Sequence, residues 1–185
     1  MSKTTQWITR NAMGIALFVA TSMCLRVPVY DNFYVCLGYV IMTVYMYLFT
    51  PLDGIVVGCL GTAIYCLLIG GMRGMPGWIL ANIVIGINVG LVLQMIKHGV
   101  FENKLVKYSV ITAITVLAVA IGIFGAKSLL ECIIYAQPML VRMIINAPAF
   151  VTDTIVIVLS VPLCELLAKN KAISRYMTKV ELNLQ

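Results

Sequence analysis

Runs of apolar residues, each ended by polar or helix-breaking positions, divide the chain into six predicted helices. The runs cover residues 11–25, 33–49, 54–69, 78–96, 108–126 and 138–168. Pro28 lies in the break after the first run, and the tight turn Thr50–Asp53 follows the second. A bilayer core of about 30 Å requires roughly 20 apolar helical residues, so the first run is short. The last run exceeds that length and should tilt, or kink at Pro148.

The composition indicates that these helices cross a membrane. Hydrophobic residues make up 62% of the 185 residues, only 11% are charged, and the mean hydropathy is +1.01. Soluble domains carry about 25% charged residues, which excludes that class. No small-residue cleavage site follows the first run, so we expect it to be retained as a helix. The sequence predicts an all-α integral membrane protein with one six-helix domain over residues 1–185.

The positions of the basic residues predict the orientation. Six spans place both termini on one side, and the loops and ends of that side hold nine basic residues: Lys3, Arg10, Lys97, Lys104, Lys107, Lys169, Lys171, Arg175 and Lys179. The other side holds four: Arg26, Arg73, Lys127 and Arg142. Cytoplasmic loops carry the excess of Lys and Arg, so we expect cytoplasmic termini. The same distribution argues against a nucleic-acid partner despite the net charge of +6.

Small residues mark surfaces for close helix packing. Ala12, Ala16 and Ala20 recur every four residues in the first run and form one narrow stripe on a helix. The third run carries a comparable face at Gly54, Gly58 and Gly61. The alanine stripe predicts contact with another helix, either of this chain or of another protein.

Polar residues inside the last run require partners. Arg142, Asn146 and Asp153 fall within about 40° of one another on a helix, and lipid cannot satisfy them. This polar stripe faces protein or a cavity. For Asp153 we weigh a structural hydrogen-bond network against a functional role, and for Asn146 we favour ligand contact. Trp78 and Asn82 share a face near the outer end of the fourth run.

The predicted external loops, residues 26–32, 70–77 and 127–137, add aromatic and charged residues beside these faces. We expect the loops and helix faces together to form a substrate site, and the alternative is an aromatic belt with solvated charges. The predicted substrate-binding residues are Arg26, Tyr30, Asp31, Tyr34, Arg73, Trp78, Asn82, Arg142 and Asn146.

No pattern in the sequence predicts catalysis, a metal or a cofactor. The six cysteines show no C-x-x-C spacing, and His98 is the only histidine. We expect a transport protein rather than an enzyme. A self-contained secondary transporter or channel is the first alternative, and it would require inverted repeats that the two halves do not show. A non-transport membrane scaffold is the second, and it would not need the polar stripe.

The chain resembles the membrane-embedded S components of energy-coupling factor (ECF) transporters, which import vitamins in prokaryotes. The resemblance rests on the six-span size, the alanine stripe, the glycine-rich third span, the G-x-x-G-x-P-G-W loop over Gly71–Trp78 and the outer-half Asn146. It implies that Ala12, Ala16 and Ala20 dock on a transmembrane coupling subunit. It also implies two partner ATPases, a site in the prokaryotic cell membrane, and a lid at Tyr30 and Asp31.

The residue types give a general idea of the substrate. Arg26, Arg73 and Arg142 suit a carboxylate or phosphate, and the Tyr, Trp and Asn residues suit a heteroaromatic ring. A folate-, pterin- or deazapurine-like compound would use both. No substrate-specific signature stands out in the sequence.

Overall fold

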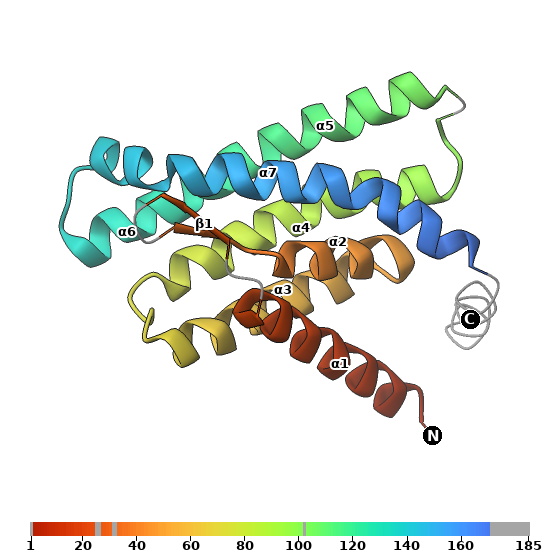
Figure 1. The fold of residues 1–185 in the computed structure, drawn as a ribbon, viewed down its shortest axis with the longest axis horizontal. Coiled ribbons are helices and arrows are strands. Elements are labelled where there is room, and N and C mark those ends of the chain that lie inside the picture. The colour runs from red at the N-terminus through yellow and green to blue at the C-terminus, as the bar shows by residue number, and fades with distance from the viewer. Residues whose placement is uncertain (1, 25–26, 31–32, 102, 171–185) are drawn as a thin grey trace.

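The structure is a computed structural model that describes residues 2–24, 27–30, 33–101 and 103–170 (Figure 1). Within these residues, helices form a bundle elongated along one axis, and a short β-hairpin lies near one end. The elements in chain order are α1 (Lys3–Cys24), β1 (Val27–Tyr30), β2 (Phe33–Val35), α2 (Gly38–Leu48), α3 (Pro51–Ile69), α4 (Met75–Lys97), α5 (Lys104–Ala120), the π-helix η1 (Ile121–Lys127), α6 (Ser128–Tyr135) and α7 (Met139–Lys169).

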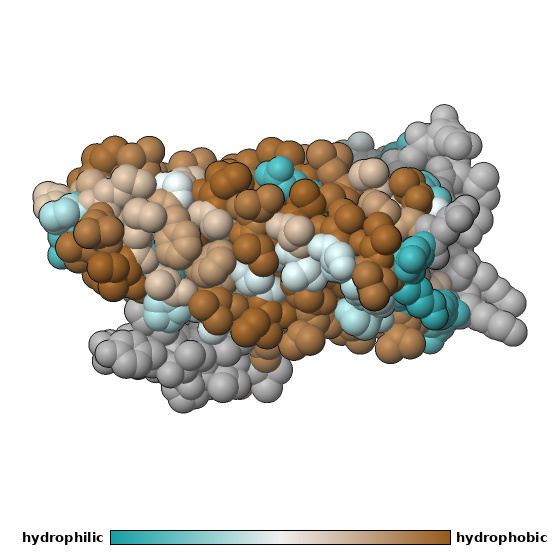
Figure 2. Space-filling view, turned by 90° about the horizontal axis from the view of Figure 1, so that it is seen from above, coloured by the Kyte–Doolittle hydropathy of each residue, from teal (hydrophilic) through white to brown (hydrophobic). Residues whose placement is uncertain are grey.

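The helices confirm the prediction of an all-helical membrane bundle. Helices α3, α4 and α7 are long and apolar enough to span a bilayer, and so is the continuous helix Lys104–Tyr135 made by α5, η1 and α6. Helix α2 is a shorter apolar helix, and with α1 the described residues contain six helical rods. Figure 2 shows hydrophobic residues along most of one face, with hydrophilic residues gathered at the end near the C-terminus.

The two ends of the bundle carry different loops. The β-hairpin, the α3–α4 loop and the α6–α7 loop lie at one end, which we call the hairpin end (Figure 1). The start of α1, the α2–α3 turn, the α4–α5 loop and the end of α7 lie at the other, which we call the terminal end. Successive loops thus lie at opposite ends of the bundle, in agreement with the predicted division of the loops between two sides of the membrane.

The helix predicted over residues 33–49 begins later in the structure than expected, so its predicted start is wrong. Phe33–Val35 forms β2, which pairs antiparallel with β1 in the register Val27↔Val35 and Pro28↔Tyr34, and α2 begins only at Gly38. Val, Tyr and Phe favour extended backbone, and two such segments flank the predicted external loop. The apolar character of Phe33–Val35 therefore marked a strand instead of the first turn of a helix.

The boundary after the fifth predicted run, residues 108–126, is also wrong. The charges of Lys127 and Glu131 favoured an external loop with a helical turn over residues 127–137, but the helix continues through η1 and α6 to Tyr135. Both charged residues are buried. Their burial is tolerated because polar groups of other helices bond to them inside the bundle. A hydropathy profile along the chain does not contain this information.

Glycines let α1, α2 and α3 approach closely around Phe18. The Phe18 side chain is fully buried, and a Cβ atom at Gly38 or Gly61 would lie within 2.8 or 2.6 Å of its ring. Gly54 and Gly58 likewise face Met46 and Met42 of α2. The predicted close-packing face of the third run is therefore confirmed.

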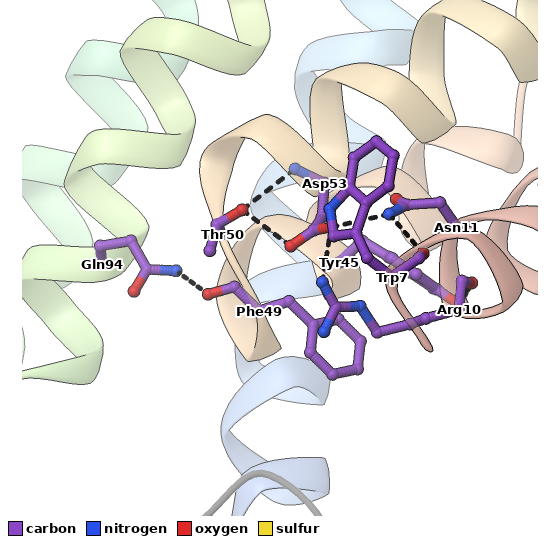
Figure 3. A network of polar contacts seen from close by, with 8 residues as sticks. All are labelled: Trp7, Arg10, Asn11, Tyr45, Phe49, Thr50, Asp53 and Gln94. Carbon is purple, nitrogen blue, oxygen red and sulfur yellow. Dashed lines mark hydrogen bonds and ion pairs between the residues drawn. The ribbon is translucent and has the colours of Figure 1, made fainter. Parts of the chain in front are cut away.

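A buried carboxylate ties α1 to the α2–α3 turn at the terminal end (Figure 3). Asp53 Oδ1 accepts hydrogen bonds from Arg10 Nη2 at 2.7 Å and from Asn11 Nδ2 at 2.8 Å. Asp53 Oδ2 accepts one from Thr50 Oγ1 at 2.7 Å, and Thr50 in turn caps α3 by accepting from Asp53 N. Both carboxylate oxygens thus have donors, which offsets the cost of burying the charge.

Candidate ligand-binding site

A cavity of about 310 Å³ lies between α3, α4, α6 and α7 near the hairpin end. This volume is at the small end of the range for small-molecule sites, about 300–1,000 Å³. Its polar lining consists mainly of Lys127, Glu131, Arg142, Asn146 and Asp153, and its aromatic lining of Tyr65, Trp78 and Tyr135.

Three charged side chains from α6, the end of η1 and α7 form one buried ionic cluster. Glu131 Oε2 accepts a hydrogen bond from Arg142 Nη2 at 3.1 Å, and Glu131 Oε1 lies 3.9 Å from Lys127 Nζ. The side chains of Glu131 and Lys127 are 4% and 3% exposed. The carboxylate compensates two cations, so the cluster carries a surplus of one positive charge.

Asn146 connects this cluster across two helices. Its Oδ1 accepts a hydrogen bond from Lys127 Nζ at 2.8 Å, and its Nδ2 donates to Glu131 Oε2 at 2.9 Å and to Ser128 Oγ at 3.2 Å. Ser128 Oγ donates to the carbonyl of Ile123 inside η1. Asn146 is thereby held in one orientation, with its amide at the edge of the cavity.

Aromatic rings cover the two cations on their other sides. Lys127 Nζ lies 4.3 Å from the centroid of the Trp78 ring, and the Arg142 guanidinium carbon lies 4.0 Å from that of Tyr135. Cation–π contacts of this length stabilise a desolvated cation. They also place flat apolar surfaces directly beside hydrogen-bonding groups.

Asp153 lines the inner end of the cavity. It lies 153 − 142 = 11 residues after Arg142 on α7, which is about 16 Å of helix. Its side chain is buried. The cavity therefore has polar groups along α7 from Arg142 to Asp153 and aromatic rings beside its two cations, which suits a partly flat molecule with hydrogen-bonding groups.

Helix α1 presents a separate surface. Asn11, Gly14, Phe18 and Ser22 face the bundle, where α1 packs on α2 and α3. The predicted stripe Ala12, Ala16 and Ala20 lies on the exposed side. No described contact of the bundle covers these three alanines, so a second protein can approach the α1 backbone there.

One protein family matches almost the whole chain. The model of the ECF-type riboflavin transporter S component matches residues 2–169, from the start of α1 to the end of α7. The chain belongs to this family. The predicted resemblance is thereby confirmed, and the protein is a membrane transport subunit of the ECF S component type. No solved structure matches the chain at a significant level of similarity.

In this S component the cavity brings together three of the predicted substrate-binding residues. Trp78 from α4 and Arg142 and Asn146 from α7 all line it. Asp153 lines it as well, so the whole predicted polar stripe of the last helix faces the cavity. Helical periodicity was sufficient to place these residues on one face.

Two other predicted residues lie elsewhere in the S component. Asn82 is fully buried and does not line the cavity; its Oδ1 accepts from Tyr39 Oη at 2.8 Å, and its Nδ2 donates to Gly58 O and Thr62 Oγ1. These bonds join α2, α3 and α4. Arg73 is exposed on the α3–α4 loop and does not line the cavity.

The remaining predicted contacts involve the β-hairpin. Arg26 and Asp31 lie outside the described residues, and for Tyr30 and Tyr34 the structure describes the strand backbone alone. Strand β2 packs against α7, and Cys36, directly after β2, lines the cavity. The hairpin therefore lies beside the cavity.

Sequence reasoning missed several cavity residues of the S component. Lys127 and Glu131 were assigned to an external loop, and Tyr65, Cys66 and Tyr135 were not considered. One signal was present: Lys127 and Glu131 are four residues apart within the apolar pattern of residues 127–135, so both charges fall on one helix face. That spacing indicates a helix with one polar face.

Proposed function

We propose that this S component captures riboflavin, or a closely related flavin, from outside the cell. The family name supplies the vitamin, and the chemistry of the cavity agrees with it. Riboflavin has a flat tricyclic ring with carbonyl and N–H groups on one edge and a polyhydroxyl chain at the other end. The rings of Trp78 and Tyr135 suit the tricycle, and Lys127, Asn146 and Arg142 suit its oxygens.

The observation that carries this proposal is the cluster centred on Asn146. Buried charged groups in a membrane span are costly and mark ligand pathways. Here the charged side chains and Asn146 form a cluster of hydrogen-bond donors and acceptors that lines the cavity near the hairpin end. Riboflavin would be bound by exchanging some of these internal hydrogen bonds for bonds to the vitamin.

The energy for transport comes from partners in this proposal. The exposed face Ala12, Ala16 and Ala20 docks on a transmembrane coupling subunit, and two ATPases hydrolyse nucleotide on the cytoplasmic side. The S component lies in a prokaryotic cell membrane with its terminal end in the cytoplasm, so the cavity opens outward. The nine basic residues of the predicted cytoplasmic side support this orientation.

Ligand titration tests the proposal. Protein purified in detergent without its partners is titrated with riboflavin, and binding is followed by quenching of flavin fluorescence and by native mass spectrometry. We expect a one-to-one complex without ATP. Asn146→Ala should weaken binding about 10- to 100-fold, because it removes hydrogen bonds to charged groups.

The matched control is Asn88→Ala, which removes an exposed asparagine that donates a hydrogen bond to Val84 O of its own helix. It should leave the affinity unchanged. If riboflavin does not bind but another vitamin in the same titration does, the substrate is wrong. If no vitamin binds, the proposed function is wrong.

A further inference from the structure

Asp153 is a buried acid whose chemistry the cluster around Asn146 does not use. Its side chain is 1% exposed and lines the inner end of the cavity. Within the part of the chain that the structure describes, its Oδ2 atom has no hydrogen-bond partner. An unpaired carboxylate oxygen in a membrane span is costly, so its retention calls for a partner from outside the chain.

Two hydroxyl groups within reach of Asp153 donate their protons to other acceptors. Tyr39 and Thr152 lie beside the carboxyl group. The single hydroxyl proton of Tyr39 is donated to Asn82 Oδ1 at 2.8 Å, and Thr152 Oγ1 donates to the carbonyls of Pro148 and Ala149. These side chains therefore leave Asp153 Oδ2 as an open acceptor.

Lys127 interacts electrostatically with Asp153, but its Nζ and the terminal nitrogens of Arg142 have other hydrogen-bond partners. Lys127 Nζ bonds to Asn146 Oδ1 at 2.8 Å and lies near Glu131, and Arg142 bonds to Glu131 and Gln137. Arg142 lies about 16 Å of helix away from Asp153, toward the hairpin end. The inner end of the cavity thus presents an acceptor oxygen without a hydrogen-bond donor, while the groups of the outer part bond mainly to one another.

We propose that Asp153 Oδ2 accepts a hydrogen bond from an N–H or O–H group at the leading end of the bound vitamin, and so fixes which end of the ligand enters first. This inference rests on the proposed riboflavin function. Riboflavin offers such a donor at either end: the imide N–H of its ring, or the hydroxyl groups of its side chain. A ligand without a donor at that end would leave the acid unpaired and bind weakly.

The test compares Asp153→Leu with the wild type against three flavins. Riboflavin carries both donors, 3-methylriboflavin lacks the imide N–H, and lumiflavin lacks the hydroxyl chain. We expect Asp153→Leu to weaken riboflavin binding about 10- to 100-fold, and Asp153→Asn, which keeps an acceptor oxygen, to weaken it less. For the flavin that lacks the interacting donor, Asp153→Leu should change the affinity less than about threefold.

The pattern identifies the donor. If 3-methylriboflavin is the insensitive ligand, the imide N–H meets Asp153, and if lumiflavin is insensitive, a side-chain hydroxyl does. The inference is overturned if Asp153→Leu leaves riboflavin affinity unchanged, or weakens all three flavins equally. If the wild-type protein binds no flavin, the proposed function is overturned together with the inference. If the wild type binds riboflavin but Asp153→Leu does not weaken that binding, only the inference is overturned.

A buried aspartate at the opposite end serves as the control for folding. Asp53 is also buried, but both of its oxygens have protein donors. Asp53→Asn should lower the thermal unfolding midpoint and leave the riboflavin affinity of the folded protein unchanged. Asp153→Leu should instead lower the affinity more than the stability, because it removes a carboxylate oxygen that no donor in the described part of the protein reaches. A loss of stability without loss of affinity in Asp153→Leu contradicts the inference.

Discussion

Single residues in this protein act mainly through the partners that burial gives them. Asn146 lines the cavity, and Lys127, Ser128 and Glu131 fix the orientation of its amide there. Asn82 is equally buried, yet its bonds join three helices and it contributes no atom to the cavity. The same residue type therefore has two roles, and the surrounding helices decide between them.

The buried ionic cluster leads to a prediction for Glu131. Glu131→Ala leaves Lys127 and Arg142 as buried cations without their shared carboxylate, so it should lower the free energy of unfolding by about 3–5 kcal/mol. The half-buried pair Lys107–Glu165, with 15% and 20% exposed side chains, supplies the control. Glu165→Gln should cost less than Glu131→Ala, because the Lys107–Glu165 pair is less buried and Gln keeps a hydrogen-bonding side chain.

Unfolding of both variants in detergent micelles, followed by circular dichroism, checks this prediction. Equal losses of stability in the two variants would contradict it, because the ionic cluster at the cavity would then be no more desolvated than the pair near the terminal end.

At the scale of elements, the continuous helix from α5 to α6 changes type beside the cavity. Its π-helical segment η1 comes just before the residues that reach inward, Ser128 and Glu131, and ends at Lys127. Gly122 of this segment packs against Ala81 of α4, where a Cβ would lie 3.1 Å from the carbonyl oxygen. Single π-helical turns occur frequently at functional sites, and this one connects directly to Asn146 through Ser128.

Helix α1 has one buried and one exposed face, and the exposed face supports a prediction. Ala16→Trp should reduce riboflavin uptake by cells about tenfold or more, because a large ring prevents close approach of a coupling-subunit helix. Riboflavin affinity of the purified S component should stay unchanged, since Ala16 does not line the cavity.

Leu117→Trp, on the exposed face of α5, controls for a bulky residue in the lipid-facing surface. It should preserve uptake and co-purification with the coupling subunit. Co-purification of Ala16→Trp with the coupling subunit at the wild-type level would refute docking through the alanine face.

At the scale of the whole molecule, the two ends of the bundle separate two kinds of polar chemistry. The hairpin end carries the cavity with its ionic cluster, and the terminal end carries the Asp53 network that ties α1 to the bundle (Figure 3). One end carries a cavity of ligand size, and the other fixes α1, whose exposed face we propose to be the docking surface for the coupling subunit.

The orientation of these ends predicts a labelling result. In a cysteine-free background, Met72→Cys at the hairpin end should react with a membrane-impermeant thiol reagent in intact cells. Val100→Cys at the terminal end should react only after the membrane is permeabilised. Both positions are similarly exposed, at 57% and 58%, so the comparison reports sidedness rather than burial. The opposite labelling pattern would place the cavity on the cytoplasmic side.

The sequence alone determined the features that depend on local periodicity. Apolar runs predicted the helical membrane bundle, although the β2 segment and the α5–α6 continuation were misassigned. The 3.6-residue repeat placed Arg142, Asn146 and Asp153 on one face of α7, and all three line the cavity. The glycine face of α3 followed from the same reasoning.

Only the tertiary structure decided which polar residues meet. Lys127 and Glu131 were predicted to lie in a loop, because a hydropathy scale treats every charged residue as unfavourable inside a membrane. Their burial is stabilised by Arg142 and Asn146 from α7, which lie 11 to 19 residues away in sequence. The partners of a buried charge come from other helices, so a pattern read along one segment identifies the charge but not its compensation.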